Sequence, residues 1–229
     1  MILIGLTGPT CAGKNYAAKI LEEKGVSSLD VDKLGHIALE NKKNEIKAAF
    51  GEEILDEGGA INRRKLGSIV FKNPAALRIL ENIVHPETGR LAAEWVSAQN
   101  KRFLQETANG GADSRFSGVC VINAALLNKT PFKDLFSGII LVKSPVFLRA
   151  LRAKRRDALS FSEIFSRLKS QRKFTQKFLP KNADISCIMN VGIGPFQKWE
   201  RKNFEKRLEK ILRSFILKNS TLASQKWPL

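Results

Sequence analysis

The most specific stretch of the chain is Gly8-Pro9-Thr10-Cys11-Ala12-Gly13-Lys14-Asn15, which follows an apolar segment and precedes a helical pattern. Its spacing, G-x-x-x-x-G-K, is typical of a phosphate-binding loop between a strand and a helix, where backbone N–H groups surround the phosphates. We expect Lys14 to reach the β and γ phosphate oxygens and the N-terminal end of the helix to face them. The alternative is a glycine-containing turn with a surface lysine. The flanking strand and helix favour binding of a nucleoside triphosphate.

The last position of this loop is Asn15, where Ser or Thr is usual. A Ser or Thr hydroxyl would bind Mg²⁺ directly. The carboxamide oxygen of Asn15 is also a hard, neutral donor, which Mg²⁺ accepts either directly or through water. We therefore predict Asn15 as the metal-binding residue and Mg²⁺ as the cofactor.

Short apolar segments bounded by turn or capping residues are predicted as strands. They cover residues 1–7, 26–30, 118–124, 138–142 and 186–191. Helical patterns lie between them, and this alternation is typical of β-α-β units in a parallel sheet that is covered on both faces. The predicted fold class is α/β, with the phosphate loop after the first strand.

Two insertions interrupt this alternation, and the first covers residues 33–117. Its pattern is almost wholly helical, and Pro74 and Pro86 lie where first helical turns are expected to begin. Residues 109–114 are expected to form the loop that returns the chain to the sheet.

The second insertion, residues 149–181, contains eleven Lys or Arg against two acidic residues. Arg149, Arg152 and Arg156 recur at i, i+3 and i+7, which is one face of a helix. Guanidinium groups that close over phosphates stabilise the charge of phosphoryl transfer. We therefore predict a lid whose cations lack partners until polyphosphate binds. The alternative is a solvated basic helix.

The resulting domain prediction has three parts. A core is formed by residues 1–32, 118–148 and 182–229, a helical insertion by 33–117 and a basic lid by 149–181. The core is expected to end in a helix over 196–217, followed by a tail, 219–229, without periodicity. The predicted apolar stripe of that helix consists of Phe204, Leu208, Ile211, Leu212 and Phe215.

Two carboxylates follow the second predicted strand, in Leu29-Asp30-Val31-Asp32. At i and i+2 they are expected on one face of a strand end, at the sheet edge where the phosphate loop also lies. A carboxylate there can accept or orient the proton of an attacking hydroxyl, which is the first interpretation of Asp32. The second is that Asp32 caps a helix beginning near Lys33, and the spacing favours neither. Asp30 is expected to be structural or an outer-sphere partner of Mg²⁺.

The composition limits the class of protein. The 229 residues include 39 Lys and Arg against 22 Asp and Glu, a net charge of +17, which favours a polyanionic partner. The cysteines, Cys11, Cys120 and Cys187, fit neither a disulfide framework nor a zinc site, so we expect a reducing compartment. No apolar run is long enough to span a bilayer and no signal peptide begins the chain. A cytoplasmic protein without a membrane partner is predicted.

At this point the sequence resembles the dephospho-coenzyme A kinase family, P-loop enzymes that phosphorylate the ribose 3′-hydroxyl of dephospho-coenzyme A. The resemblance includes the phosphate loop and Asp30-Val31-Asp32. Its most diagnostic part is the ordered series Gly59-Ala60-Ile61-Asn62-Arg63-Arg64-Lys65-Leu66-Gly67-Ser68-Ile69-Val70-Phe71, Asn73-Pro74 and Leu80-Glu81-Asn82-Ile83-Val84-His85-Pro86. Further matches follow in the family's order: Ser144-Pro145, Arg152, Arg156-Asp157, Gln171, Ala183-Asp184 and Asn190-Val191-Gly192.

The resemblance implies a role for each matched residue. Residues 8–15 would bind ATP, the phosphoryl donor, with Lys14 on its phosphates. Asp32 would be the base or hydroxyl-orienting residue, and Arg152 and Arg156 the catalytic lid arginines. Arg63 and His85, together with Asp32, would form the acceptor side, which binds dephospho-CoA. The implied architecture is a five-stranded P-loop core with a helical acceptor domain and a lid, as in nucleoside monophosphate kinases.

Some positions depart from the family pattern. Pro9, Cys11 and Ala12 replace small residues of the loop, and Gly35-His36 stands where Ala-Arg is usual. In Ala125-Leu126-Leu127-Asn128-Lys129 a lysine replaces the carboxylate of a Pro-Leu-Leu-x-Glu pattern.

Two rival functions are less favoured. One is another small-molecule P-loop kinase with a nucleoside or nucleotide acceptor. The other is a degenerate P-loop protein that binds nucleic acid, which is disfavoured because the charge is concentrated in the lid without interleaved aromatic residues. The sequence carries no signal for the oligomeric state.

Overall fold

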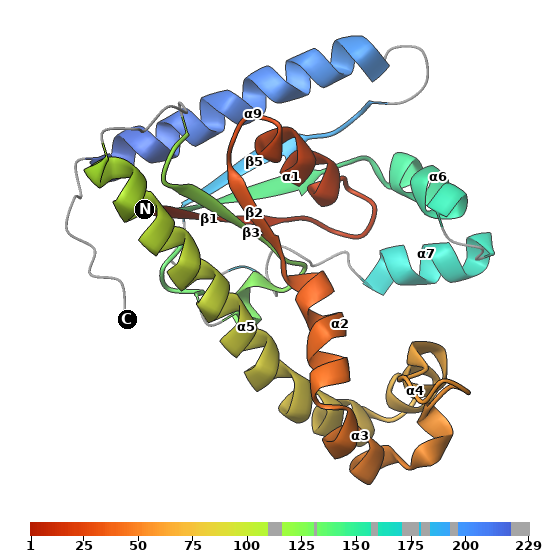
Figure 1. The fold of residues 1–229 in the computed structure, drawn as a ribbon. Helices are drawn as coiled ribbons and strands as arrows, with labels where there is room; N and C mark the ends of the chain where they lie inside the picture. Colours follow the sequence, from red (N-terminus) through yellow and green to blue (C-terminus); the bar gives the residue numbers. More distant parts are fainter. Residues whose placement is uncertain are drawn as a thin grey trace. The chain divides into compact units, whose positions relative to one another are not determined.

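A computed structural model describes residues 1–109, 116–130, 132–156, 160–170, 179, 184–192 and 197–220. Its centre is a five-stranded sheet in the order β2-β3-β1-β4-β5 (Figure 1). The strands are β1 (Ile2–Thr7), β2 (Ser27–Asp30), β3 (Val119–Asn123), β4 (Gly138–Lys143) and β5 (Ile185–Met189). Strand β1 is central and pairs in parallel with β3 and β4. The predicted α/β fold class is confirmed, because all of the predicted strands form.

Helices α1 (Lys14–Glu22) and α9 (Gln197–Ser220) cover one face of this sheet (Figure 1). Phe204, Leu208, Leu212 and Phe215 of α9 are buried, and Ile211 is partly buried against the same core. The apolar stripe predicted for the final helix is therefore confirmed, because a helix on a sheet buries the side chains that recur every three or four residues.

The chain divides into two compact units, one of residues 1–29 and 97–229 and the other of residues 30–96. The second unit contains α2 (Val31–Asn41), α3 (Lys43–Phe50), η1 (Glu52–Ile54), α4 (Arg63–Val70) and most of α5 (Pro74–Ala108). Its core consists of Ile46, Ile54, Ile61, Leu66, Val70 and Ala76. The helical character expected for this part of the chain is confirmed, while the functional division into core, acceptor insertion and lid stays a prediction.

One expectation about the helices is wrong. Pro86 does not begin a helix but lies inside α5, which runs from Pro74 to Ala108. A proline in a helix interior removes one backbone donor and is normally costly. Contacts of the next residue, Glu87, offset this here. Its buried carboxylate accepts a hydrogen bond from Asn41 of α2 at 2.7 Å and, within α5, from Arg90 at 2.8 and 2.9 Å.

The basic insertion begins with two helices, α6 (Val146–Arg156) and α7 (Phe161–Ser170). They pack on one another through Ala150, Ala153, Ile164 and Leu168. The rest of the predicted lid, apart from Leu179, lies outside the described residues, as do most of the expected loop at 109–114 and of the tail at 219–229. Among the described helices, none is long and apolar enough to cross a membrane.

Candidate active site

The phosphate loop connects the central strand β1 to α1, at the carboxyl edge of the sheet. Gly8 passes close to β4, where an added Cβ would lie 2.5 Å from the carbonyl oxygen of Val142. Gly13 has a φ of 105°, and a Cβ there would lie 2.0 Å from Nδ2 of Asn190. Both glycines of the predicted motif are therefore required by close approach, and Gly13 also by its conformation.

Cys11 adopts the left-handed region, with a φ of 59°, although it is not a glycine. This conformation costs an L-residue about 1–2 kcal/mol, and such strain gathers at functional sites. The loop also closes on itself, because the N–H of Ala12 donates to the carbonyl of Pro9 at 3.0 Å. The chain thus holds the curved loop shape without the small residues that are usual at these positions.

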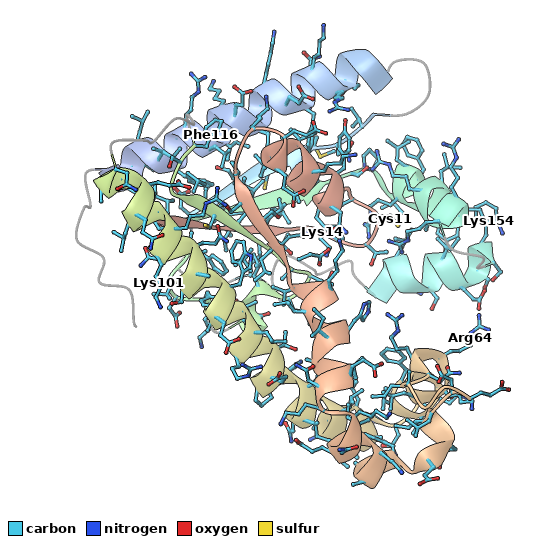
Figure 2. All side chains as sticks on the ribbon, viewed as in Figure 1. Cys11, Lys14, Arg64, Lys101, Phe116 and Lys154 are labelled. Atoms are coloured by element: carbon cyan, nitrogen blue, oxygen red, sulfur yellow. The ribbon has the colours of Figure 1, made fainter. Side chains whose placement is uncertain are left out.

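Helix α1 begins at Lys14, and within the described part of the chain no side chain caps its first turn. The backbone N–H groups of that turn therefore remain available to an anion, and the helix dipole favours negative charge there. Figure 2 shows Lys14 and Cys11 on the loop. These properties suit an anion, and the binding of ATP by residues 8–15 stays a prediction.

Asn15 lies at the second position of α1, and its carboxamide contacts another amide. Nδ2 of Asn123, at the end of β3, donates to Oδ1 of Asn15 at 3.0 Å. Asn123 is only 1% exposed, and its own Oδ1 accepts no hydrogen bond from the described residues. Sequence reasoning missed Asn123, although a polar residue directly after an apolar strand at this sheet edge is a signal for a site.

Two arginines of α6 donate hydrogen bonds to carbonyl groups of the loop. Nε of Arg149 donates to the carbonyl of Thr10 at 2.9 Å, and Nη1 of Arg152 donates to the carbonyl of Cys11 at 3.3 Å and to Oγ of Ser144 at 2.9 Å. Burial lowers the pKa of both guanidinium groups from the ordinary arginine value. The backbone carbonyls of the loop therefore stabilise charges that burial disfavours.

The prediction that the cations of the lid lack partners before polyphosphate binds is wrong for Arg149 and Arg152. A guanidinium that is fully or partly buried must find acceptors, and carbonyls of the loop are among those that Arg149 and Arg152 use. Arg156, on the last turn of α6, is exposed. The role of Arg152 and Arg156 in transfer stays a prediction.

Asn190 connects three elements of the site. Its N–H donates to the carbonyl of Lys143 on β4 at 2.8 Å, and its Nδ2 donates to the loop carbonyl of Ala12 at 3.0 Å. In turn its carbonyl and Oδ1 each accept from Nη2 of Arg152 at 3.3 Å. The sequence included Asn190 in a family motif but gave it no role, because a contact between residues so far apart in the chain has no local signature.

A cavity of about 200 Å³ opens beside the loop and the guanidinium of Arg152. Nη2 of Arg152 also donates to the carbonyl of Gly192 at 3.1 Å, so this side chain forms part of an ordered wall. The remaining lining residues come mainly from α1 and α9. The cavity is lined by Gly13, Tyr16, Arg152, Asn190, Gly192, Glu200, Arg201 and Phe204.

The two carboxylates after the second strand belong to the helical unit and have different positions. Asp30 is the N-cap of α2, because its Oδ1 accepts from the N–H groups of Asp32 at 3.1 Å and Lys33 at 3.3 Å. The interpretation of Asp32 as the cap is therefore wrong, as is the expectation that both carboxylates share a strand face. Asp32 lies in the first turn of α2 with an exposed side chain.

The two residues predicted for the acceptor side also lie in the helical unit. Arg63 is the first residue of α4 and is exposed, while Asn62 caps that helix by accepting from the N–H groups of Arg64 and Lys65, each at 3.1 Å. His85 is exposed on α5, directly before Pro86. Neither residue is buried in the core of its unit, so both side chains remain accessible to a ligand.

A parallel sheet with a phosphate loop after its central strand, and with a basic helix bonded to that loop, defines a P-loop kinase fold. The family within this class follows from comparison with known proteins. The family model for dephospho-CoA kinase matches residues 2–190, and the chain belongs to that family. The resemblance that the motifs indicated is confirmed, and the remaining residues, 191–229, lie outside the match.

Individual relatives agree with this membership. A dephospho-CoA kinase of Thermus thermophilus is 32% identical over 170 residues, which cover 74% of this chain and 75% of that protein. A dephospho-CoA kinase of Borrelia garinii is 31% identical over 214 residues, covering 92% of this chain and 95% of that protein. Most of the chain is therefore comparable with members of the family.

Solved structures are similar in fold. A crystal structure of a Thermus thermophilus protein matches with a TM-score of 0.69 and 29% identity, covering 93% of this chain and 97% of that one. A dephospho-CoA kinase of Campylobacter jejuni matches with a TM-score of 0.56 and 24% identity, covering 93% and 96% of the two chains. The second likeness supports the fold alone.

Proposed function

We propose that this chain transfers the γ-phosphoryl group of ATP to the ribose 3′-hydroxyl of dephospho-CoA, giving CoA and ADP, which is the last step of coenzyme A biosynthesis. The observation that carries this proposal is a formed phosphate loop in a chain that belongs to the dephospho-CoA kinase family. Phosphoryl transfer requires positioning and charge stabilisation more than covalent chemistry by the protein.

The phosphate end of ATP is assigned to residues 8–15. Lys14 neutralises charge on the β and γ phosphates, while the uncapped N–H groups at the start of α1 donate to their oxygens. Arg156 is assigned to the transferred group as a lid arginine. Its exposure leaves the guanidinium accessible to a phosphate.

The base of ATP is assigned to the cavity of about 200 Å³ beside the loop. The guanidinium of Arg152 is fixed there by its hydrogen bonds to Asn190 and Gly192, so its planar face can stack against an aromatic base. This position also links the base site to the loop, because the same side chain donates to the carbonyl of Cys11.

The acceptor side is assigned to the helical unit. Asp32 is proposed to accept or orient the proton of the 3′-hydroxyl, since Asp30, and not Asp32, serves as the helix cap. Arg63 and His85 are proposed to contact dephospho-CoA, a phosphate-containing ligand that suits a cationic partner.

Mg²⁺ is proposed as the cofactor, held by Asn15 directly or through water. The fit is supported by the donor set, since Oδ1 of Asn15 and Oδ1 of the buried Asn123, which accepts no hydrogen bond from the described residues, are hard, neutral oxygen donors. When bound, the ion would neutralise charge on the β and γ phosphate oxygens.

A cytoplasmic location without a membrane partner is part of the proposal. Cys11, Cys120 and Cys187 are the three cysteines of the chain, and none of them forms a disulfide bond, which suits a reducing compartment. Nucleic acid is not proposed as a partner, because Arg149 and Arg152 of α6 bind the protein's own backbone.

The test is an ADP-release assay with ATP, with and without Mg²⁺, across dephospho-CoA, a nucleoside, a nucleotide and shikimate. Selective turnover of dephospho-CoA is expected, and turnover of another acceptor alone would identify a different P-loop kinase. Lys14→Ala should abolish transfer, because losing such a contact raises the barrier by about 3 kcal/mol or more.

The same assay tests the proposed base. Asp32→Asn should lower the rate by roughly 10²-fold while leaving ATP binding nearly intact. Asp30→Asn is the matched control, since it changes only the cap of α2. A larger loss of rate in Asp30→Asn would show that the wrong carboxylate is assigned.

A further inference from the structure

The amide of Asn123 occupies an unusual position for a buried polar group. It ends β3, where the register of the sheet places it opposite Leu6 of β1, just before the phosphate loop. Its Nδ2 donates to Asn15, yet its Oδ1 is buried without a hydrogen bond from the described residues. A buried acceptor without a hydrogen bond is costly, so it points to a partner that arrives with the ligand.

The two oxygen atoms that Asn15 and Asn123 offer beside the start of α1 are neutral. Asn15 and Asn123 contribute amide oxygens only, and among the described residues no group of three His, Cys, Asp or Glu side chains could hold a metal ion. The affinity of an oxygen site for a divalent cation depends on how many of its ligands are charged. Two amides alone can therefore orient a divalent cation, but they carry too little negative charge to bind it tightly in the absence of nucleotide.

We propose that Asn123 is a positioning residue for Asn15, and that the two amides form a neutral cradle for a divalent cation that enters together with the nucleotide. This inference rests on the proposed nucleotide-binding function of the loop. The hydrogen bond from Asn123 uses one of the two acceptor sites on Oδ1 of Asn15 and leaves the other for the cation or its water. The phosphates of the nucleotide supply the negative charge.

The direct test is a titration with Mn²⁺, which takes the same oxygen ligands as Mg²⁺, followed by electron paramagnetic resonance. The wild-type protein should bind Mn²⁺ in the presence of ADP and fail to bind it in the absence of nucleotide at the same concentration. Equally tight binding without nucleotide would overturn the proposal, because two amides cannot retain a free dication.

Asn123→Asp replaces the amide by a carboxylate of the same shape. It should increase the affinity for Mn²⁺ without nucleotide by roughly tenfold or more, because it adds a charged ligand. Asn109→Asp is the matched control, as it adds the same charge at an exposed side chain, where, among the described residues, Asn109 bonds only through its backbone N–H to the carbonyl of Gln105. An equal increase in the two variants would show a general charge effect and overturn the assignment.

The positioning role is tested by Asn123→Ala. It should weaken Mn²⁺ binding in the ADP complex by about 10–100-fold, the usual effect of removing a partner that orients a metal ligand. Asn123→Ser, which keeps a short donor, should restore part of this affinity. A lower melting temperature with unchanged Mn²⁺ affinity would mean that Asn123 is only structural.

The substitutions of the buried Asn123 could unfold the protein, so a second variant, Asn15→Ser, is made at a residue that is exposed at the start of α1. The serine side chain is shorter and cannot reach Asn123 in the same way, so the Mn²⁺ spectrum of the ADP complex should change. An unchanged spectrum would contradict contact between residue 15 and the cation.

These readouts do not depend on the acceptor. If the protein failed to phosphorylate dephospho-CoA but Asn123→Asp still captured free Mn²⁺, the proposed function would fail and the inference would stand. If dephospho-CoA were phosphorylated and the Asn123 variants left Mn²⁺ binding unchanged, the inference alone would fail.

Discussion

Helices α6 and α9 are both rich in Lys and Arg and belong to the same compact unit, but they use their charge differently. In α6 the guanidinium groups of Arg149 and Arg152 donate to carbonyls of the phosphate loop. In α9 the cations pair with surface carboxylates, as Arg201 does with Glu23 and Glu205 at 2.6 and 2.7 Å. The acceptor that a cation meets, and not the density of charge in the sequence, therefore indicates its role.

This difference has an energetic consequence. Exposed ion pairs such as those of α9 contribute about 0–1 kcal/mol each, whereas a buried carbonyl that loses its donor costs about 1–3 kcal/mol. The shape of the loop should therefore depend on α6, and α9 should contribute mainly through its buried apolar stripe. The predictions below test this contrast, from the largest expected effect on the function of the loop to the smallest, with a stability control at the end.

Arg152→Ala should have the largest effect. It removes the hydrogen bond to the carbonyl of Cys11, which supports the loop. It also removes the hydrogen bonds to Asn190 and Gly192, which fix one side of the cavity beside the loop. Turnover should fall by roughly 10²–10⁴-fold, as for arginines that stabilise phosphoryl transfer, and the melting temperature should fall as well. An ADP-release assay and a thermal melt measure the two effects. A melting temperature equal to that of the wild-type protein would contradict the claim that Arg152 stabilises the loop.

Arg156→Ala separates the two ends of α6. This arginine is exposed, so its removal should leave the melting temperature nearly unchanged. If Arg156 is a lid arginine, turnover should still fall by roughly 10²-fold or more. The same two measurements are used. Unchanged turnover would show that Arg156 takes no part in transfer and that only Arg149 and Arg152 of α6 matter for the loop.

Limited trypsin digestion should show a smaller, local difference between the helices. Residues 154–156 of α6 and Lys202 and Lys206 of α9 are all exposed sites for the protease. ATP should slow cleavage at 154–156 several-fold, because bound phosphates would order this end of α6, and should leave cleavage at Lys202 and Lys206 unchanged. Mass spectrometry of the fragments separates the sites. Equal protection would indicate a general stabilisation of the fold.

Much of this fold could be predicted from the sequence, because apolar strands and the glycine spacing of the loop are local signals. The expectation at Pro86 failed because the buried contacts of Glu87 outweigh the local preference of a proline. The hydrogen-bond partners of Asn123 and Asn190 could not be predicted. Each bonds to a residue more than a hundred positions away, and only the folded sheet brings such partners together.

Arg207→Ala should have the smallest effect and provides the control for Arg152→Ala. Its Nη2 donates to the carbonyl of Met189 at 3.0 Å, but this contact is exposed, so water can replace the lost donor. Turnover should change by less than about twofold, since an exposed charge away from the site contributes little.

The neighbouring Leu208→Ala shows that α9 is still needed. Leu208 is fully buried, and its truncation should lower the free energy of unfolding by about 2–5 kcal/mol in a urea titration. The fraction that stays folded should keep its affinity for ATP, because Leu208 belongs to the apolar core under α9 and does not line the cavity beside the loop. A protein that used its positive charge to bind nucleic acid would lose affinity by similar steps at Arg152 and Arg207. Equal sensitivity at these two positions would therefore contradict the contrast between the helices and favour the nucleic-acid alternative.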